Sequence, residues 1–334
     1  MICFADFLIV AKMSIQDILI SEIQIENSLF STKEVLFEPE MDDSCLNKSF
    51  HTIGILNPVI LYKDAYNSLH LVAGKKRLTY AIKNNHKYIQ AVMLKDNTSI
   101  SDILLFLYNE KKEIINQSVI NKIQFLVFSI GMGVKDDELF FSALLGFKPY
   151  NNFYEDCHRI SSLPLELKIF SHDKKLSFKY LVNLSFYPKD LLCKLIQWKD
   201  LLSFTASIFE EIASNLRDYL KAHDKTIDDV LSDREVQEIF TSNKTSPRQK
   251  LEQLRRLIHV KKSPTLCKVN EKIEYFVKEL NLPKNITLSW DRALENKYVE
   301  VKFFIQKPEE WKTALDRCSQ SSFESTLSSI LNEL

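Results

Sequence analysis

A short, glycine-led basic segment is the part of the sequence best suited to bind a ligand. Gly74 is followed by Lys75, Lys76 and Arg77, and these residues open a stretch with helical spacing. The first N–H groups of a helix have no intrahelical acceptor, and the helix dipole places partial positive charge at the same end. Cations at this point therefore predict a site for an anion such as phosphate.

The residues around this segment are strongly basic, although the whole chain has a net charge of +0. Between Asp64 and Asp96 no acidic residue occurs, and the cations there are Lys75, Lys76, Arg77, Lys83, Lys87 and Lys95. Segregated charge of this kind can bind a polyanion despite overall neutrality. A solvated basic surface without a ligand is the alternative.

Three apolar runs are expected to position the basic segment. Residues 59–62 and 69–73 predict two strands, and residues 88–94 predict a third strand after the helix. Gly-Ile-Leu-Asn-Pro, residues 54–58, stands directly before the first of these strands.

This unit resembles the N-terminal domain of the ParB family, partition proteins that bind DNA and, in many members, cytidine triphosphate. In that family Gly-Leu/Ile-Leu-Gln-Pro precedes one strand, and Gly-Glu-Arg-Arg follows the next strand and starts a helix. The resemblance also places the family's Glu-Asn-Leu-Gln-Arg segment on residues 108–112. The phosphate or nucleotide site that it implies comprises Gly54, Asn57, Pro58, Gly74, Lys75, Lys76, Arg77, Asn109 and Lys112.

Two acidic residues of the family pattern are absent, because Lys75 and Tyr108 stand in their places. In active relatives those residues help to position or hydrolyse the nucleotide. The resemblance therefore implies cytidine triphosphate with magnesium as a candidate ligand, and phosphate binding is predicted without hydrolysis. Sulfiredoxins share this small fold, but their catalytic Cys is replaced here by Lys75, so no thiol nucleophile is present.

The sequence predicts no catalytic residue. It has no Walker-type glycine loop, no His-x-x-x-His pair and no clustered carboxylates for metal-assisted cleavage. The six cysteines are scattered without a Cys-x-x-Cys pair, which indicates reduced thiols and a cytoplasmic protein. No run of 18 apolar residues occurs, so no membrane span is expected.

Two segments are candidates for DNA contact. Helices expected over 135–145 and 152–160 follow the helix-turn-helix order of ParB relatives, with Asn151, Asn152 and Arg159 as candidates. A basic helix expected over 248–260 adds Arg248, Arg255 and Arg256. Because the 152–160 helix also carries Glu155 and Asp156, a structural or protein-binding role for it is the alternative.

The predicted fold is α+β and mostly helical, in three domains. Residues 14–97 form the ParB/sulfiredoxin-like domain, 98–225 form a helical domain with a degenerate helix-turn-helix, and 226–334 form an α+β domain for which dimerisation is expected. Further predicted elements are helices over 201–222 and 267–280, a hairpin of 286–290 with 298–305, and two terminal helices.

Two functional hypotheses remain open. The first is a non-catalytic, ParB-like, partition-type protein with DNA, a second copy of the chain and a ParA-like or other protein as partners. The second is a protein-interaction module that kept the ParB architecture and lost both nucleotide and DNA binding. A nucleotide-hydrolysing switch would need another residue in place of the missing Glu.

Overall fold

The computed structural model describes residues 14–25, 28–32, 35–37, 44–134 and 137–334. The chain divides into two compact units, Met1–Ile196 and Gln197–Leu334, and each is described by itself. The three-domain division expected from the sequence stays a prediction. Within the predicted 14–97 domain, residues 26–27, 33–34 and 38–43 lie outside the described residues.

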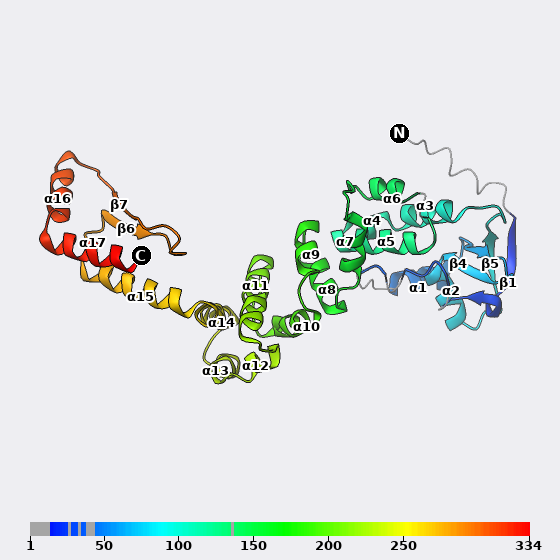
Figure 1. Cartoon of the computed structure of the whole chain (residues 1–334). Coiled ribbons are helices and arrows are strands. Elements are labelled where there is room, and N and C mark those ends of the chain that lie inside the picture. The colour runs from blue at the N-terminus through cyan, green and yellow to red at the C-terminus, as the bar shows by residue number, and fades with distance from the viewer. Residues whose placement is uncertain (1–13, 26–27, 33–34, 38–43, 135–136) are drawn as a thin grey trace. The chain divides into compact units, whose positions relative to one another are not determined.

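A five-stranded mixed sheet forms the N-terminal part of the first unit (Figure 1). Its order is β1-β5-β3-β4-β2, with β1–β5 and β3–β4 antiparallel and β3–β5 and β2–β4 parallel. The strands are β1 (Ile15–Leu19), β2 (Ile23–Gln24), β3 (Val59–Lys63), β4 (Leu69–Ala73) and β5 (Tyr88–Met93). The three strands expected around the basic segment are therefore all present.

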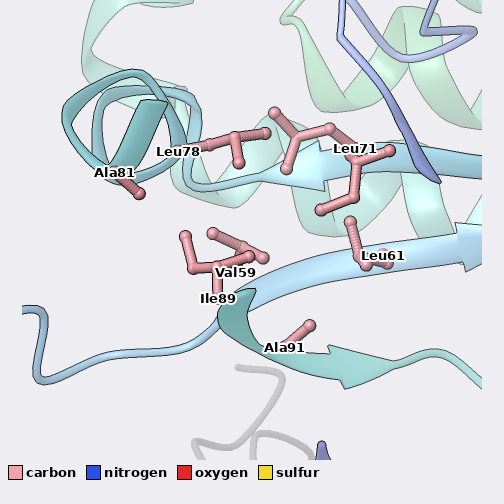
Figure 2. Close-up of a cluster of buried hydrophobic side chains, with 8 residues drawn as sticks. Val59, Leu61, Leu71, Leu78, Ala81, Ile89 and Ala91 are labelled. Atoms are coloured by element: carbon pink, nitrogen blue, oxygen red, sulfur yellow. The ribbon is translucent and has the colours of Figure 1, made fainter. Parts of the chain in front are cut away.

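Helix α2 (Lys75–Lys83) packs on this sheet through one apolar face. Leu78 and Ala81, three residues apart and so on the same side of the helix, are both fully buried. Figure 2 shows them pointing at side chains from the three central strands. Those side chains are Val59, Leu61, Leu71, Ile89 and Ala91. This packing fixes the start of α2 at the end of β4.

A helix formed by residues 119–131 is the centre of the helical part of the first unit and contacts four of the other helices there. The helices before it are α1 (Ser44–Ile53), α3 (Ile100–Glu110) and α4 (Lys112–Asn116). Then come α5 (Val119–Gly131), α6 (Glu138–Leu144), α7 (Phe153–Ser161), α8 (Leu165–Asp173), α9 (Phe178–Leu184) and α10 (Lys189–Gln197). Ser99 and Ser118 cap α3 and α5 by accepting hydrogen bonds from N–H groups of the first turn.

The second unit combines four helices with a small α+β part. The helices are α11 (Ala206–His223), α12 (Ile227–Leu231), α13 (Arg234–Thr241) and α14 (Pro247–Lys262). Next come α15 (Pro264–Glu279), β6 (Ile286–Trp290), β7 (Val299–Phe303), α16 (Pro308–Cys318) and α17 (Ser321–Glu333). β6 and β7 pair antiparallel, and Ile273, Leu288, Phe323 and Ile330 belong to the core beside them.

The chain is 59% helical, and the predicted fold class is confirmed. Two predicted helix starts were wrong. The helix expected from residue 201 begins at Ala206, because the Thr205 side chain accepts a hydrogen bond from Ile208 N and caps it. The helix expected from residue 267 begins at Pro264, a residue type well suited to the first turn. Within the described part of the chain, no helix combines the length and apolarity that a membrane crossing needs.

Candidate phosphate-binding site

The turn between β4 and α2 depends on Gly74. This residue has φ +102°, in the left-handed region that favours glycine, and it is the N-cap of α2. The first bond of the helix runs from Leu78 N to Gly74 O at 3.0 Å. Because glycine has no side chain, the N-cap residue places no capping group over the positive end of the helix.

The same glycine lies very close to β3. A Cβ atom added at Gly74 would lie 2.8 Å from Val59 Cγ1 and 3.2 Å from Arg77 Cζ. Any larger residue would therefore push the start of α2 away from the strand. Close packing and backbone conformation both require glycine here.

Arg77 ties the loop before β3 to the first turn of α2. Its Nη1 donates to Asn57 O at 3.0 Å and also to Pro58 O. Burial lowers the pKa of the guanidinium, and the nearby Glu110 carboxylate opposes that shift. Arg77 thus has a structural role that the sequence did not predict, while its contact with phosphate stays a prediction.

A cleft of about 1310 Å³ lies beside this turn. Its described lining comes from the β4–α2 junction, from α1, from the α3–α4 junction, from α8 and from residues 28–37. The cationic lining residues are Lys75, Lys76, Arg77, Lys83 and Lys111, and the carboxylates are Glu110 and Asp173. Positive charge therefore predominates among the described residues that line the cleft.

One side of the cleft is the wall segment, which we define as residues 28–32 and 35–37. Its first end is bound to the sheet, since Ser28 Oγ donates to Leu71 O at 2.7 Å. Leu29 N donates to His70 Nδ1 at 3.4 Å, and His70 Nε2 lies 3.0 Å from Asp64 Oδ2. The hydrogen bond from His70 lowers the pKa of the Asp64 carboxyl. Because Nδ1 accepts from Leu29 N, Nε2 is the ring nitrogen that faces the Asp64 carboxylate as a donor.

The other end of the wall segment is held by a buried asparagine on α5. Asn121 Oδ1 accepts from Phe37 N at 2.9 Å, and its Nδ2 donates to Phe37 O at 3.1 Å and to Ile114 O at 2.9 Å. His172 on α8 lies beside Phe37, with ring centroids 5.6 Å apart, and its Nδ1 is 2.8 Å from Ser118 Oγ. The sequence did not predict a role for these residues. The one sequence feature that could have indicated a role for Asn121 is that a polar residue stands on the inward face of an otherwise apolar helix.

The structure brings together only part of the residue set predicted from the sequence. Asn57, Gly74, Lys75, Lys76 and Arg77 line the cleft. Gly54 lies just after the last residue of α1 with φ +76°, and Pro58 contributes its carbonyl to Arg77.

Asn109 and Lys112 are exposed and do not line the cleft, whereas their neighbours Glu110 and Lys111 do. The orientation of the end of α3 decides this difference. Sequence matching does not determine which face of a helix end points inward, so the roles of Asn109 and Lys112 in ligand binding stay predictions.

The DNA candidate Arg159 is engaged within α7. It donates to Asp156, a buried carboxylate that also accepts from Tyr150 Oη, and its guanidinium lies 4.3 Å from the centre of the Phe186 ring. Asn151 and Asn152 are exposed just before the helix. Of the three candidates in this segment, the arginine is thus committed to an internal contact.

Arg255 on α14 is engaged in the same way within the second unit. Its Nη2 and Nε donate to the two carboxylate oxygens of Glu211 on α11 at 2.7 and 3.1 Å, and its Nη1 donates to Glu252 at 3.1 Å. The hydrogen bonds to Glu211 raise the pKa of Arg255. Arg248 and Arg256 are exposed on the same helix. The basic helix thus uses one of its three candidate arginines to pack against α11.

Replacing Gly74 by Ala is expected to destabilise the first unit by about 2–4 kcal/mol, from left-handed strain and overpacking against Val59. Gly54→Ala is the matched control, since its φ is also positive but nothing lies within 4 Å of the added Cβ. Hydrogen exchange of β3 and β4 amides suits this test, because all three tryptophans lie in the second unit. Equal losses in the two variants would contradict the close-packing account.

Arg77→Lys should cost about 1–3 kcal/mol, because one ammonium cannot replace the charged hydrogen bonds to two adjacent carbonyls. We expect faster amide exchange confined to residues 54–58 and the first turn of α2. Lys83→Arg, a charge-conserving change later on the same helix, should leave exchange in that loop unchanged. Unaltered exchange in Arg77→Lys would show that the Asn57 and Pro58 contacts are dispensable.

Among known proteins, the chain is similar to solved structures only. No protein-family model matches the chain, and no curated protein matches it. The chain is similar to a C-terminally truncated chromosome-partitioning protein ParB from Caulobacter crescentus complexed with CTP-gamma-S, at 15% identity and a TM-score of 0.25. That match covers 55% of this chain and 98% of the other.

Two further structures show a comparable likeness. The same Caulobacter protein complexed to the centromeric parS site matches at 12% identity and TM-score 0.30, over 60% of this chain and 98% of that one. A Pnob8-like ParB-N domain matches at 13% identity and TM-score 0.33, over 75% of this chain and 98% of that one. These values mark a remote likeness to ParB structures, which says nothing by itself about what this chain binds.

Proposed function

We propose that this chain is a non-catalytic, ParB-like, DNA-associated protein whose first unit binds the phosphate groups of a nucleotide. The observation that carries the proposal is the basic cleft at the start of α2. Lys75, Lys76 and Arg77 lie at the positive end of α2 and line the cleft. Lys83, at the other end of α2, and Lys111, before α4, also line it. Helix dipole and side-chain charge therefore act on the same space.

The uncharged lining favours a nucleotide over isolated phosphate. Phe30, Phe50, Leu71 and Tyr80 line the same cleft as the lysines, and the Phe50 and Tyr80 rings lie 5.0 Å apart. A nucleoside triphosphate has one polyanionic end and one flat, weakly polar end, which matches such a mixed lining. At about 1310 Å³ the cleft exceeds the roughly 300–1,000 Å³ of common ligand pockets, so size does not exclude a nucleotide.

DNA contact in this proposal involves the exposed candidates Asn151, Asn152, Arg248 and Arg256. Such contacts would go mainly to the phosphate backbone, since Asn151 and Asn152 precede α7 and the helix itself presents no row of base-reading side chains. A cytoplasmic location and a ParA-like or other protein partner belong to the same proposal.

A second copy of the chain is the partner proposed for the C-terminal sheet. β6 and β7 pair only with each other within the described residues, so each has one edge without a neighbouring strand. Phe304 and Trp311, close to the end of β7, are 59% and 48% exposed. Pairing of β7 edges across a dimer would satisfy backbone groups and cover these rings.

A protein-interaction module without nucleotide or DNA is the competing proposal. The ion pairs of Arg159 with Asp156 and of Arg255 with Glu211 favour it, because they commit two of the candidate DNA-binding arginines to internal contacts. The two tests that follow distinguish the proposals.

Calorimetry with cytidine triphosphate tests the cleft. We expect binding by the native chain, and about tenfold tighter binding by Glu110→Gln, since the variant removes a negative charge next to Arg77. Glu113→Gln is the control, because Glu113 is exposed on α4 and does not line the cleft. Absence of heat with every nucleoside triphosphate, together with a stable protein partner in pull-down experiments, would favour the interaction module.

Fluorescence titration of a labelled duplex tests DNA association. Contact with phosphates predicts an affinity that falls steeply between low and moderate salt. The double variant Arg248→Ala/Arg256→Ala should flatten this dependence and weaken binding to all duplexes alike. Lys272→Ala, which removes a cation paired with Glu333 in the same unit, serves as a charge-matched control for each arginine. No binding by the native chain at low salt would rule out DNA association.

A further inference from the structure

The cleft supplies positive charge along a line and not at a single point. Lys75 and Lys83 both line it, and they are eight residues apart on α2. At 1.5 Å rise per residue this separation is about 12 Å along the helix axis. Lys111 adds a cation from the α3–α4 junction. A single phosphate could not reach all of these positions, whereas a chain of phosphates could contact several of them.

The charge of such a ligand needs a counter-charge. A triphosphate carries roughly four negative charges near neutral pH, because the last pKa of a phosphate group is about 6. In most nucleotide sites Mg²⁺ supplies much of the neutralisation and is held by one or two carboxylates together with the phosphates. The described residues that line this cleft include five lysines and arginines and two carboxylates, Glu110 and Asp173.

The donor set that the described residues bring to the cleft is poorly suited to a metal ion. Mg²⁺ prefers oxygen ligands, and lysine ammonium groups repel it. Of the two lining carboxylates, Glu110 lies close enough to act electrostatically on Arg77. Among the described residues, no group of three or more His, Cys, Asp or Glu side chains is placed to hold a metal ion.

We propose that the cleft binds the triphosphate chain of a nucleotide without a divalent cation, with Lys75, Lys83 and Lys111 taking over the neutralising role of the metal. This inference rests on the proposed function, because it concerns the same cleft. It adds that magnesium is dispensable for binding and competes with the lysines for phosphate oxygens. The first unit would then bind the metal-free form of a nucleotide at least as tightly as the magnesium complex.

Calorimetry on the full chain tests this inference with cytidine, adenosine, guanosine and uridine triphosphates and with inorganic tripolyphosphate. Each probe is titrated once in EDTA and once in excess magnesium chloride. Binding in EDTA at least as tight as in magnesium, by tripolyphosphate and by one or more nucleotides, is the expected result. Nucleotide binding without any tripolyphosphate binding would overturn the inference, because the lysines would not be the main contacts.

Two further outcomes separate the inference from the proposed function. Binding that requires magnesium would overturn the metal-free inference and leave nucleotide binding in place. Absence of binding in both buffers would overturn both.

Adjacent lysines provide matched variants for the same titration. Lys111 lines the cleft and Lys112 does not, so Lys111→Ala should weaken binding in EDTA by about tenfold, whereas Lys112→Ala should leave it unchanged. Lys111→Ala should also make magnesium favourable, because the ion would then restore lost positive charge. Equal effects of the two substitutions would contradict a role for the cleft cations, and circular dichroism would identify a variant that fails to fold.

Discussion

The contact between the Gly74 turn and β3 is the constraint on which the first unit depends. The backbone of this turn approaches Val59 so closely that even a Cβ atom would lie 2.8 Å from its side chain. Arg77 then holds the loop before β3 by its carbonyls, so strand, loop and helix start form one connected piece. Because the cleft begins at this turn, the positions of its lysines follow from this packing.

The cleft is assembled from segments that are distant in the sequence. The wall segment is bound to the sheet through Ser28 and to α5 through Asn121, over a separation of 84 residues between Phe37 and Asn121. Buried hydrogen bonds of this kind are costly to leave unmade, so they specify one arrangement of the wall. The sheet and the helices of the first unit are thereby joined around the candidate site.

Three of the basic side chains selected from the sequence make contacts within the chain. Arg77, Arg159 and Arg255 all donate to carbonyls or carboxylates within the chain. An arginine suits such contacts because its planar guanidinium presents several donors in a fixed geometry. Lys75, Lys83 and Lys111 line the cleft in which a nucleotide is proposed to bind.

Local sequence patterns were sufficient to determine the mostly helical α+β class, the strands around the basic segment and the helix start at Lys75. These features depend on hydrophobic periodicity and turn chemistry, which act over a few residues. Tertiary structure alone decided that Glu110 and Lys111 line the cleft in place of Asn109 and Lys112, and that Asn121 holds the wall. Those outcomes depend on how a helix end is rotated against distant segments, and no local pattern carries that information.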